Sequence, residues 1–213
     1  MGLPGRVFRR VQGGGWLVLA GSIPDFEEAV SWIDLLLARA VASRPVVWLE
    51  TEPGAVEPGE FLNDIEEQVE APVQSIPINH PGWESAGLLM VSEAADPAGL
   101  ARSEASPRLL ACLQSGAAVA AFGRTAGAFG EVILAEGGLA PGMAWLSASI
   151  ILPESMTVTA AEPLVRDYLR SPEKRLGLRL PSSSVLALGP QGEVEVWGGP
   201  QPGLILGSAW SHA

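Results

Sequence analysis

AAVAAFGRTAGAFGE, residues Ala117–Glu131, joins an apolar run to a cluster of small residues. The apolar run, Ala117–Phe122, is short and continuous, which is typical of a β-strand buried on both faces. The next six residues, Gly123–Ala128, carry mostly small side chains around Thr125, and small side chains suit a tight turn that leads into a helix. The pattern predicts a strand, a sharp turn and a helix over about residues 126–135.

The alternation of strands and helices continues on both sides of this stretch. We expect strands over residues 15–20, 46–49, 73–78, 88–91 and 145–152, and helices over residues 23–40, 58–70, 106–113 and 159–169. This order is typical of an α/β fold, a three-layer α/β/α sandwich around a doubly wound, mostly parallel sheet. Short apolar runs between Gly- and Pro-rich turns, at 184–188, 193–197 and 204–206, predict a C-terminal antiparallel extension. No linker divides the chain, so we expect a single domain over residues 1–213.

Composition excludes several classes of protein. The chain has 213 residues, 47% of them hydrophobic, which is enough to bury a sizeable core. Its net charge of −11 opposes binding to a phosphate backbone, so we expect no nucleic-acid partner. One cysteine and two histidines rule out an intramolecular disulfide and a histidine-rich metal site, so no metal is expected.

Targeting and cofactor signals are weak. The apolar run Trp16–Ala20 is too short for a signal peptide, and no run approaches the roughly 18–20 apolar residues of a membrane span. We therefore expect a cytoplasmic protein without a membrane partner. Gly13, Gly14 and Gly15 precede a strand, whereas the glycines of a dinucleotide-binding fingerprint follow one, so no cofactor is expected. The expected partner is a small molecule or peptide, and self-association into a homo-oligomer is left open.

In open α/β sheets, ligands bind beyond the carboxyl ends of the strands. Applied to the expected strands, this rule selects a short set of candidate binding residues: Glu50, Glu52, Ser92, Glu93, Gly123, Arg124 and Ala126. A crevice rich in carboxylates with one arginine favours a basic or amine-bearing ligand. The same carboxylates could equally be solvated loop residues of an acidic protein.

Thr125 is the candidate catalytic residue. A nucleophile elbow places a hydroxyl at the apex of a tight strand-to-helix turn, where small neighbours avoid a collision and the helix dipole favours developing negative charge. An ordinary strand-to-helix turn, with small residues for close packing, has the same spacing. The spacing alone does not separate the two interpretations.

The stretch resembles the nucleophile elbow of the cyanophycinase and dipeptidase E family of serine peptidases, which has the sequence Gly-x-Ser-Ala-Gly-Ala. Gly13–Gly21 is similar to the glycine-led first strand of that family, and Arg175–Gly199 is similar to its late strand and hairpin. The resemblance implies a class I glutamine amidotransferase-like fold. It also implies that Thr125 stands at the position of the family's serine nucleophile.

The chain departs from the family pattern at each catalytic element. The serine is replaced by Thr125, and Ser92-Glu93 stands where the family has a glycine pair that supplies an oxyanion-hole amide. The family histidine is expected between residues 144 and 170, but the only histidines are His80 and His212. A weak hydroxyl nucleophile needs an adjacent base. We therefore expect a catalytically degenerate protein that keeps a binding crevice.

Two further expectations can be tested on coordinates. An active peptidase or amide hydrolase would use Thr125 as nucleophile with an unusual base, either His80 or a carboxylate. The elbow geometry predicts a positive φ at Thr125 and a hydroxyl facing the crevice, although a β-branched residue adopts positive φ only under strain. Cys112, in a predicted helix 13 positions before Thr125, is expected to be a packing residue.

Overall fold

The computed structural model describes residues 7–24, 26–52, 59–135, 137–154 and 162–212. Its main sheet has seven strands in the order β11-β10-β1-β5-β4-β2-β3. Five of them are parallel: β1 (Leu17–Ala20), β2 (Val46–Glu50), β3 (Gln74–Pro77), β4 (Leu88–Val91) and β5 (Ala118–Phe122). The hairpin of β10 (Ser184–Leu188) and β11 (Val194–Gly198) adds to β1 in antiparallel fashion. Two of the three strands of the predicted antiparallel extension therefore join the main sheet at its β1 side, whereas the third, at residues 204–206, pairs with Leu176–Leu180 in a second sheet.

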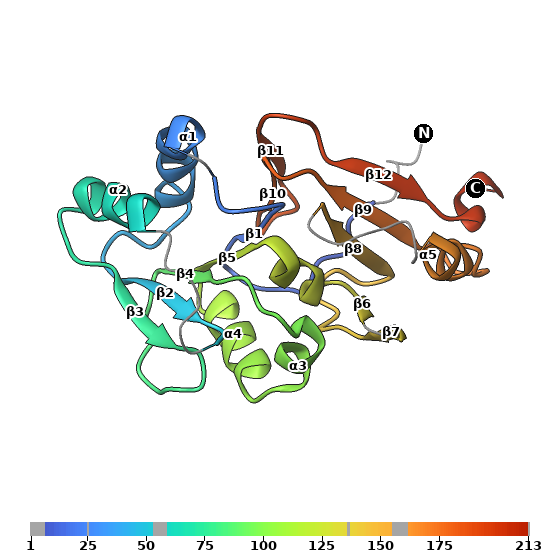
Figure 1. Cartoon of the computed structure of the whole chain (residues 1–213), viewed down its shortest axis with the longest axis horizontal. Coiled ribbons are helices and arrows are strands. Elements are labelled where there is room, and N and C mark those ends of the chain that lie inside the picture. The colour runs from blue at the N-terminus through green and yellow to red at the C-terminus, as the bar shows by residue number, and fades with distance from the viewer. Residues whose placement is uncertain (1–6, 25, 53–58, 136, 155–161, 213) are drawn as a thin grey trace.

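Helices cover both faces of this sheet, as Figure 1 shows. One face packs against α1 (Phe26–Leu37) and α2 (Gly59–Val69), through side chains such as Trp48 and Phe122 of the sheet. The other face packs against α3 (Pro97–Arg102) and α4 (Ala105–Gln114), through residues such as Leu49 and Ala121. Neighbouring strand residues point to opposite faces, so continuous apolar runs supply both cores. The predicted α/β sandwich is confirmed.

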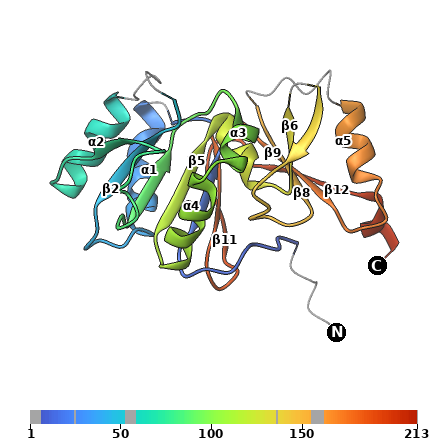
Figure 2. The same cartoon turned by 90° about the horizontal axis from the view of Figure 1, so that it is seen from below.

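A second sheet of five strands was not expected from the sequence. Its order is β12-β9-β8-β6-β7, and β8 lies parallel to β6 and β9. It lies beside the main sheet, and α5 (Glu162–Leu169) packs on it (Figure 2). The strands are β6 (Val132–Ala135), β7 (Gly138–Pro141), β8 (Ser149–Pro153), β9 (Leu176–Leu180) and β12 (Gly203–Leu206). Phe129 and Trp145 pack edge to face at 4.8 Å in the core that the two sheets share.

The helix expected over residues 126–135 is wrong. A 3₁₀ helix, η1 (Gly123–Phe129), is followed directly by β6, which pairs with β7 and β8. Gly137 directly precedes β7 and Gly138 begins it, and both adopt a positive φ that glycine tolerates. A second 3₁₀ helix, η2 (Ser208–His212), ends the described chain. Residues 25, 58 and 159–161, expected in the first turns of three helices, lie outside the described residues.

The register of the main sheet aligns the strand ends that matter for a site. Leu49 of β2 pairs with Val91 of β4, and Val91 pairs with Ala121 of β5. The residues that follow these strands therefore meet at one edge of the sheet, as expected for parallel strands. Thr51, Ser92 and Gly123 start the three loops at that edge.

Candidate functional site

Thr125 lies inside the protein at this edge, and its hydroxyl is fully buried. Oγ1 donates a hydrogen bond to the Ser92 carbonyl oxygen at 2.7 Å and accepts one from the Ala94 amide at 2.7 Å. Both partners belong to the loop after β4. The hydroxyl therefore connects η1 to that loop, and no imidazole or carboxylate among the described residues bonds to it.

The predicted elbow geometry at Thr125 is wrong. In the described part of the chain, the non-glycine residues with positive φ are Glu70, Ala144 and Ala148. Thr125 instead lies within the 3₁₀ helix that begins at Gly123. A β-branched side chain crowds the backbone at positive φ, and here the turn avoids that strain by placing its positive φ on a glycine.

Gly123 occupies the apex of the turn, with φ of +55° directly after β5. A Cβ at this position would lie 2.7 Å from the Glu93 carboxylate. That carboxylate accepts a hydrogen bond from the Arg124 amide at 3.0 Å. The apex therefore carries no side chain that could act as a nucleophile, and the Glu93 side chain fills the adjacent space.

The other candidate residues at this edge hold loops together. The Ser92 hydroxyl accepts a hydrogen bond from the Thr51 amide at 2.9 Å, and the Thr51 hydroxyl donates to the Glu93 carbonyl at 3.0 Å. The Glu52 carboxylate accepts from the Ala95 amide at 2.7 Å. The structure thus brings the loops after β2, β4 and β5 into one hydrogen-bonded unit.

Two candidates lie apart from this unit. The Glu50 carboxylate accepts a hydrogen bond from the Ser75 hydroxyl at 2.5 Å, and Ser75 belongs to β3, the outermost strand of the main sheet. Ala126, within η1, is buried in the apolar core of the protein. The sequence favoured a crevice rich in carboxylates, but Glu50, Glu52 and Glu93 each bind a group of the protein itself.

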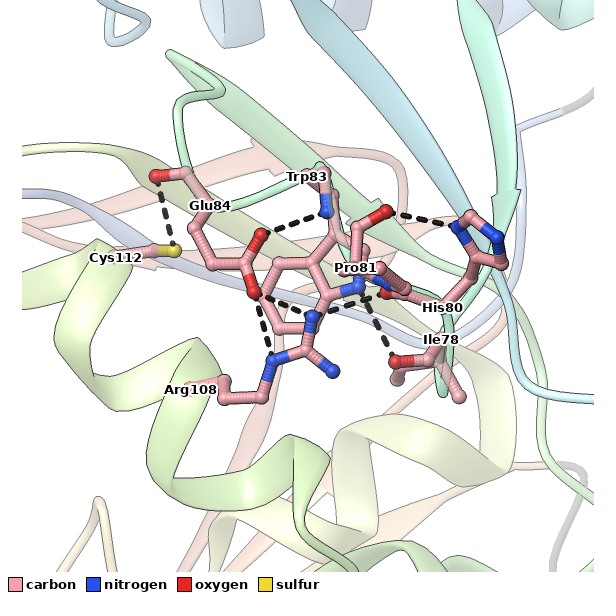
Figure 3. Close-up of polar contacts among 8 residues, drawn as sticks. Ile78, His80, Pro81, Trp83, Glu84, Arg108 and Cys112 are labelled. Atoms are coloured by element: carbon pink, nitrogen blue, oxygen red, sulfur yellow. Dashed lines mark hydrogen bonds and ion pairs between the residues drawn. The ribbon is translucent and has the colours of Figure 1, made fainter.

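His80 belongs to a separate cluster on the loop between β3 and β4, shown in Figure 3. Its Nδ1 lies 2.8 Å from the Pro81 carbonyl oxygen. Nearby, the Arg108 guanidinium stacks over the Trp83 ring at 4.2 Å and binds the Glu84 carboxylate. The imidazole therefore contacts its own loop and makes no hydrogen bond to Thr125. The side chain of His212 lies outside the described residues.

Cys112 is buried beside the same loop, as the sequence predicted for a packing residue. Its Sγ lies 3.5 Å from the Glu84 carbonyl oxygen. Burial raises the pKa of the Cys112 thiol, which disfavours the reactive thiolate. Arg108 has the opposite effect on Glu84, because its hydrogen bonds lower the pKa of that carboxyl.

A cavity of about 580 Å³ opens beside Arg124. It lies between the start of α3, the first turn of η1 and the β6–β7 hairpin. Its charged lining residues are Asp96, Arg102 and Arg124, and its apolar wall includes Ile133, Leu134, Ala135 and Ala140. Of the candidate residues predicted from the sequence, Arg124 lines this cavity.

The sequence analysis missed Asp96, Arg102 and the apolar wall of the cavity. The wall was missed because residues 126–135 were assigned to a helix. The pair Gly137-Gly138, flanked by short apolar runs, is a hairpin signal that could have revealed it. Asp96 and Arg102 carry no motif and reach the cavity only through the packing of α3.

In comparisons with known proteins, no family model matches the chain, and no curated protein matches it significantly. Within the described ranges, no group of three or more His, Cys, Asp or Glu side chains is arranged to hold a metal ion. No helix in that part of the chain is long and apolar enough to cross a membrane.

Proposed function

We propose that this chain is a non-catalytic binding protein on a class I glutamine amidotransferase-like fold, and that it holds a small molecule or peptide in the cavity beside Arg124. The observation that carries the proposal is the burial of the Thr125 hydroxyl. This hydroxyl accepts a hydrogen bond from one backbone amide and donates one to a backbone carbonyl. The sequence resemblance supplies the family, and the cavity supplies the binding space.

The chemistry of acyl transfer supports the non-catalytic part of this proposal. A hydroxyl nucleophile must reach a substrate carbonyl and must lose its proton to a base. Attack by Thr125 would first require the hydrogen bonds to Ser92 and Ala94 to break. The apex of the turn is Gly123, which has no side chain, and Glu93 covers it. Interdependent catalytic parts lose most of their effect together, so restoring one should do little.

The catalytic part is tested with purified protein on Asp-Xaa dipeptides and on an aspartyl-arginine polymer of the cyanophycin type. We expect no turnover from the wild type or from Thr125→Ser. Turnover that disappears in Thr125→Ala would overturn the proposal and establish Thr125 as the nucleophile of an active hydrolase.

The binding part is tested by screening a fragment set of neutral, anionic and cationic compounds with ligand-observed NMR. Ala140→Trp is the blocking variant, because Ala140 lines the cavity and an indole would fill it. A matched control is Ala42→Trp, at an exposed position after α1 that lines a different surface hollow. We expect at least one compound whose signal is lost in Ala140→Trp and kept in Ala42→Trp. Hits that survive Ala140→Trp, or an absence of hits, would contradict binding at this cavity.

A further inference from the structure

The cavity wall is positively charged, whereas the protein as a whole is acidic. Two of its three ionisable lining residues are arginines, so the wall carries a net charge of about +1 while the chain carries −11. Anions are repelled by most of the molecule and are attracted here. The carboxylate-rich crevice that the sequence favoured would have selected a cation, whereas the lining of this cavity favours an anion.

Among the described residues, Arg124 differs from the other partly buried arginines in how its guanidinium is held. Six arginines form ion pairs with carboxylates: Arg39, Arg102, Arg108, Arg166, Arg170 and Arg175. Arg10 is held by backbone carbonyls instead. Among the described residues, Arg9, Arg44, Arg179 and Arg124 form no ion pair, but the first three are exposed, whereas Arg124 is partly buried. A guanidinium that lines a cavity and has no anion beside it is a group that a ligand anion can pair with.

The backbone around Arg124 is held in place. Its amide donates to Glu93, and the next residue, Thr125, is locked by its two buried hydrogen bonds. The preceding Gly123 fixes the turn with its positive φ. A side chain on a fixed backbone loses less conformational entropy when it binds, which favours affinity.

Arg102 provides a second cation that can reorient. It pairs with Asp96 at 3.8 Å, and both side chains are more than 60% exposed. A long, exposed ion pair contributes at most about 1 kcal/mol, so a ligand anion can compete for Arg102. Asp96 keeps the net charge of the wall at about one positive unit, which matches a monoanion better than a phosphate group of about −1.5 to −2.

We propose that the ligand of this cavity is an organic carboxylate with a short apolar chain, and that Arg124 binds its carboxylate. The inference rests on the binding function proposed above. The planar guanidinium matches a carboxylate with two parallel hydrogen bonds. The chain of the ligand contacts the wall of Ile133, Leu134 and Ala140.

The test compares four probes by titration calorimetry at fixed salt: hexanoate, 1-hexanol, hexylammonium and inorganic phosphate. We expect hexanoate to bind most tightly. Arg124→Gln should weaken hexanoate at least about tenfold, because a hydrogen-bonded charge is removed, and Arg124→Lys should weaken it less. Arg166→Gln, at an exposed position of α5, is the matched control and should leave binding unchanged. Circular dichroism confirms that each variant is folded.

Several outcomes would overturn this inference. Equal binding of 1-hexanol, tighter binding of hexylammonium or phosphate, no binding of any probe, or an unchanged affinity in Arg124→Gln would each exclude an Arg124-bound carboxylate. Binding of 1-hexanol that is lost in Ala140→Trp would still leave the proposed binding function in place. The non-catalytic proposal would fail by a different result. That result is peptide turnover that Thr125→Ala abolishes, and it does not depend on which probe binds.

Discussion

The Thr125 hydroxyl is a structural tie at the edge of the sheet, since it joins the turn after β5 to the loop after β4. Threonine suits this role because its second γ substituent adds apolar volume to a site with no solvent exposure. The residue that most resembles a nucleophile in the sequence is thereby removed from solvent.

Thr125→Val should destabilise the protein. Valine has nearly the same shape but leaves the buried Ala94 amide and Ser92 carbonyl without a partner, at about 1–3 kcal/mol for a buried group. Thr125→Ser keeps the hydroxyl and is the control, with a smaller loss. Chemical denaturation measures both variants. A valine variant as stable as the wild type would show that the two hydrogen bonds contribute nothing.

Gly123→Ala tests the apex of the turn. The substitution forces a side chain to φ of +55°, which costs about 1–2 kcal/mol, and pushes its Cβ against the Glu93 carboxylate. Glu93 has a flexible side chain and can move, but it then loses its hydrogen bond to Arg124. In a cycle with Glu93→Ala, we expect the double variant to lose less stability than the two single losses together. Strict additivity in denaturation experiments would mean that Glu93 does not occupy this space.

At the scale of elements, the loop between β3 and β4 is fastened to α4 by Arg108. The guanidinium lies over the Trp83 ring and binds both the Glu84 carboxylate and the His80 carbonyl. The Trp83 indole in turn donates to the Ile78 carbonyl at 3.2 Å. These contacts of Trp83, Glu84 and Arg108 form a clamp that holds the loop against α4, and His80 lies within the loop (Figure 3).

This clamp should weaken in acid. The Arg108 hydrogen bonds lower the pKa of Glu84 in the folded state. A carboxyl whose folded pKa is depressed adds stability above its unfolded pKa, about 4.3 for glutamate, and loses it as the pH falls through the folded pKa. Because the pair is partly exposed, its contribution is at most about 1 kcal/mol. Glu84→Gln should flatten the fall in stability below about pH 4.3, as measured by denaturation at several pH values.

A variant curve that stays parallel to the wild-type curve in that window would contradict the prediction. NMR titration of the Glu84 carboxyl gives a second reading, since its midpoint should rise in Arg108→Met. A midpoint unchanged by that substitution would mean that Arg108 does not stabilise the carboxylate.

At the scale of the whole molecule, one apolar core joins the two sheets. It contains Leu17 and Leu89 from the main sheet and Ile151 and Leu178 from the second sheet. The edge-to-face pair of Phe129 and Trp145 lies in the same core. Elements that share a core tend to unfold together, so we expect residues 1–213 to behave as a single domain.

Unfolding should therefore be one cooperative transition. Native-state hydrogen exchange should give amides of β4 and β8 the same opening free energy, because both open only by global unfolding. Phe129→Ala should lower that value by about 3–5 kcal/mol for both strands together. Exposed Val194→Ala on β11 is the control and should change little. A loss confined to β8 would mean that the second sheet opens independently.

Local patterns in the sequence were sufficient for much of this architecture. The apolar runs at Leu17–Ala20, Val46–Leu49 and Ala118–Phe122 predicted buried strands, because a strand covered on both faces needs apolar residues at successive positions. The alternation with helices predicted parallel strands, and the ends of β4 and β5 bring Ser92, Glu93 and Thr125 to one edge as expected. The strands and helices themselves depend on residues close together in the chain.

The arrangement of side chains at the candidate site depends on contacts between residues far apart in the chain. Thr125 bonds to Ser92 and Ala94, about 30 positions earlier, and residues 132–135 become a strand only because β7 and β8 pair with them. Nonlocal hydrogen bonds override weak local preferences in short segments of small residues. The direction of the Thr125 hydroxyl, the Glu93 cover over Gly123 and the arginine-lined cavity were therefore decided by packing, which no local spacing in the chain encodes.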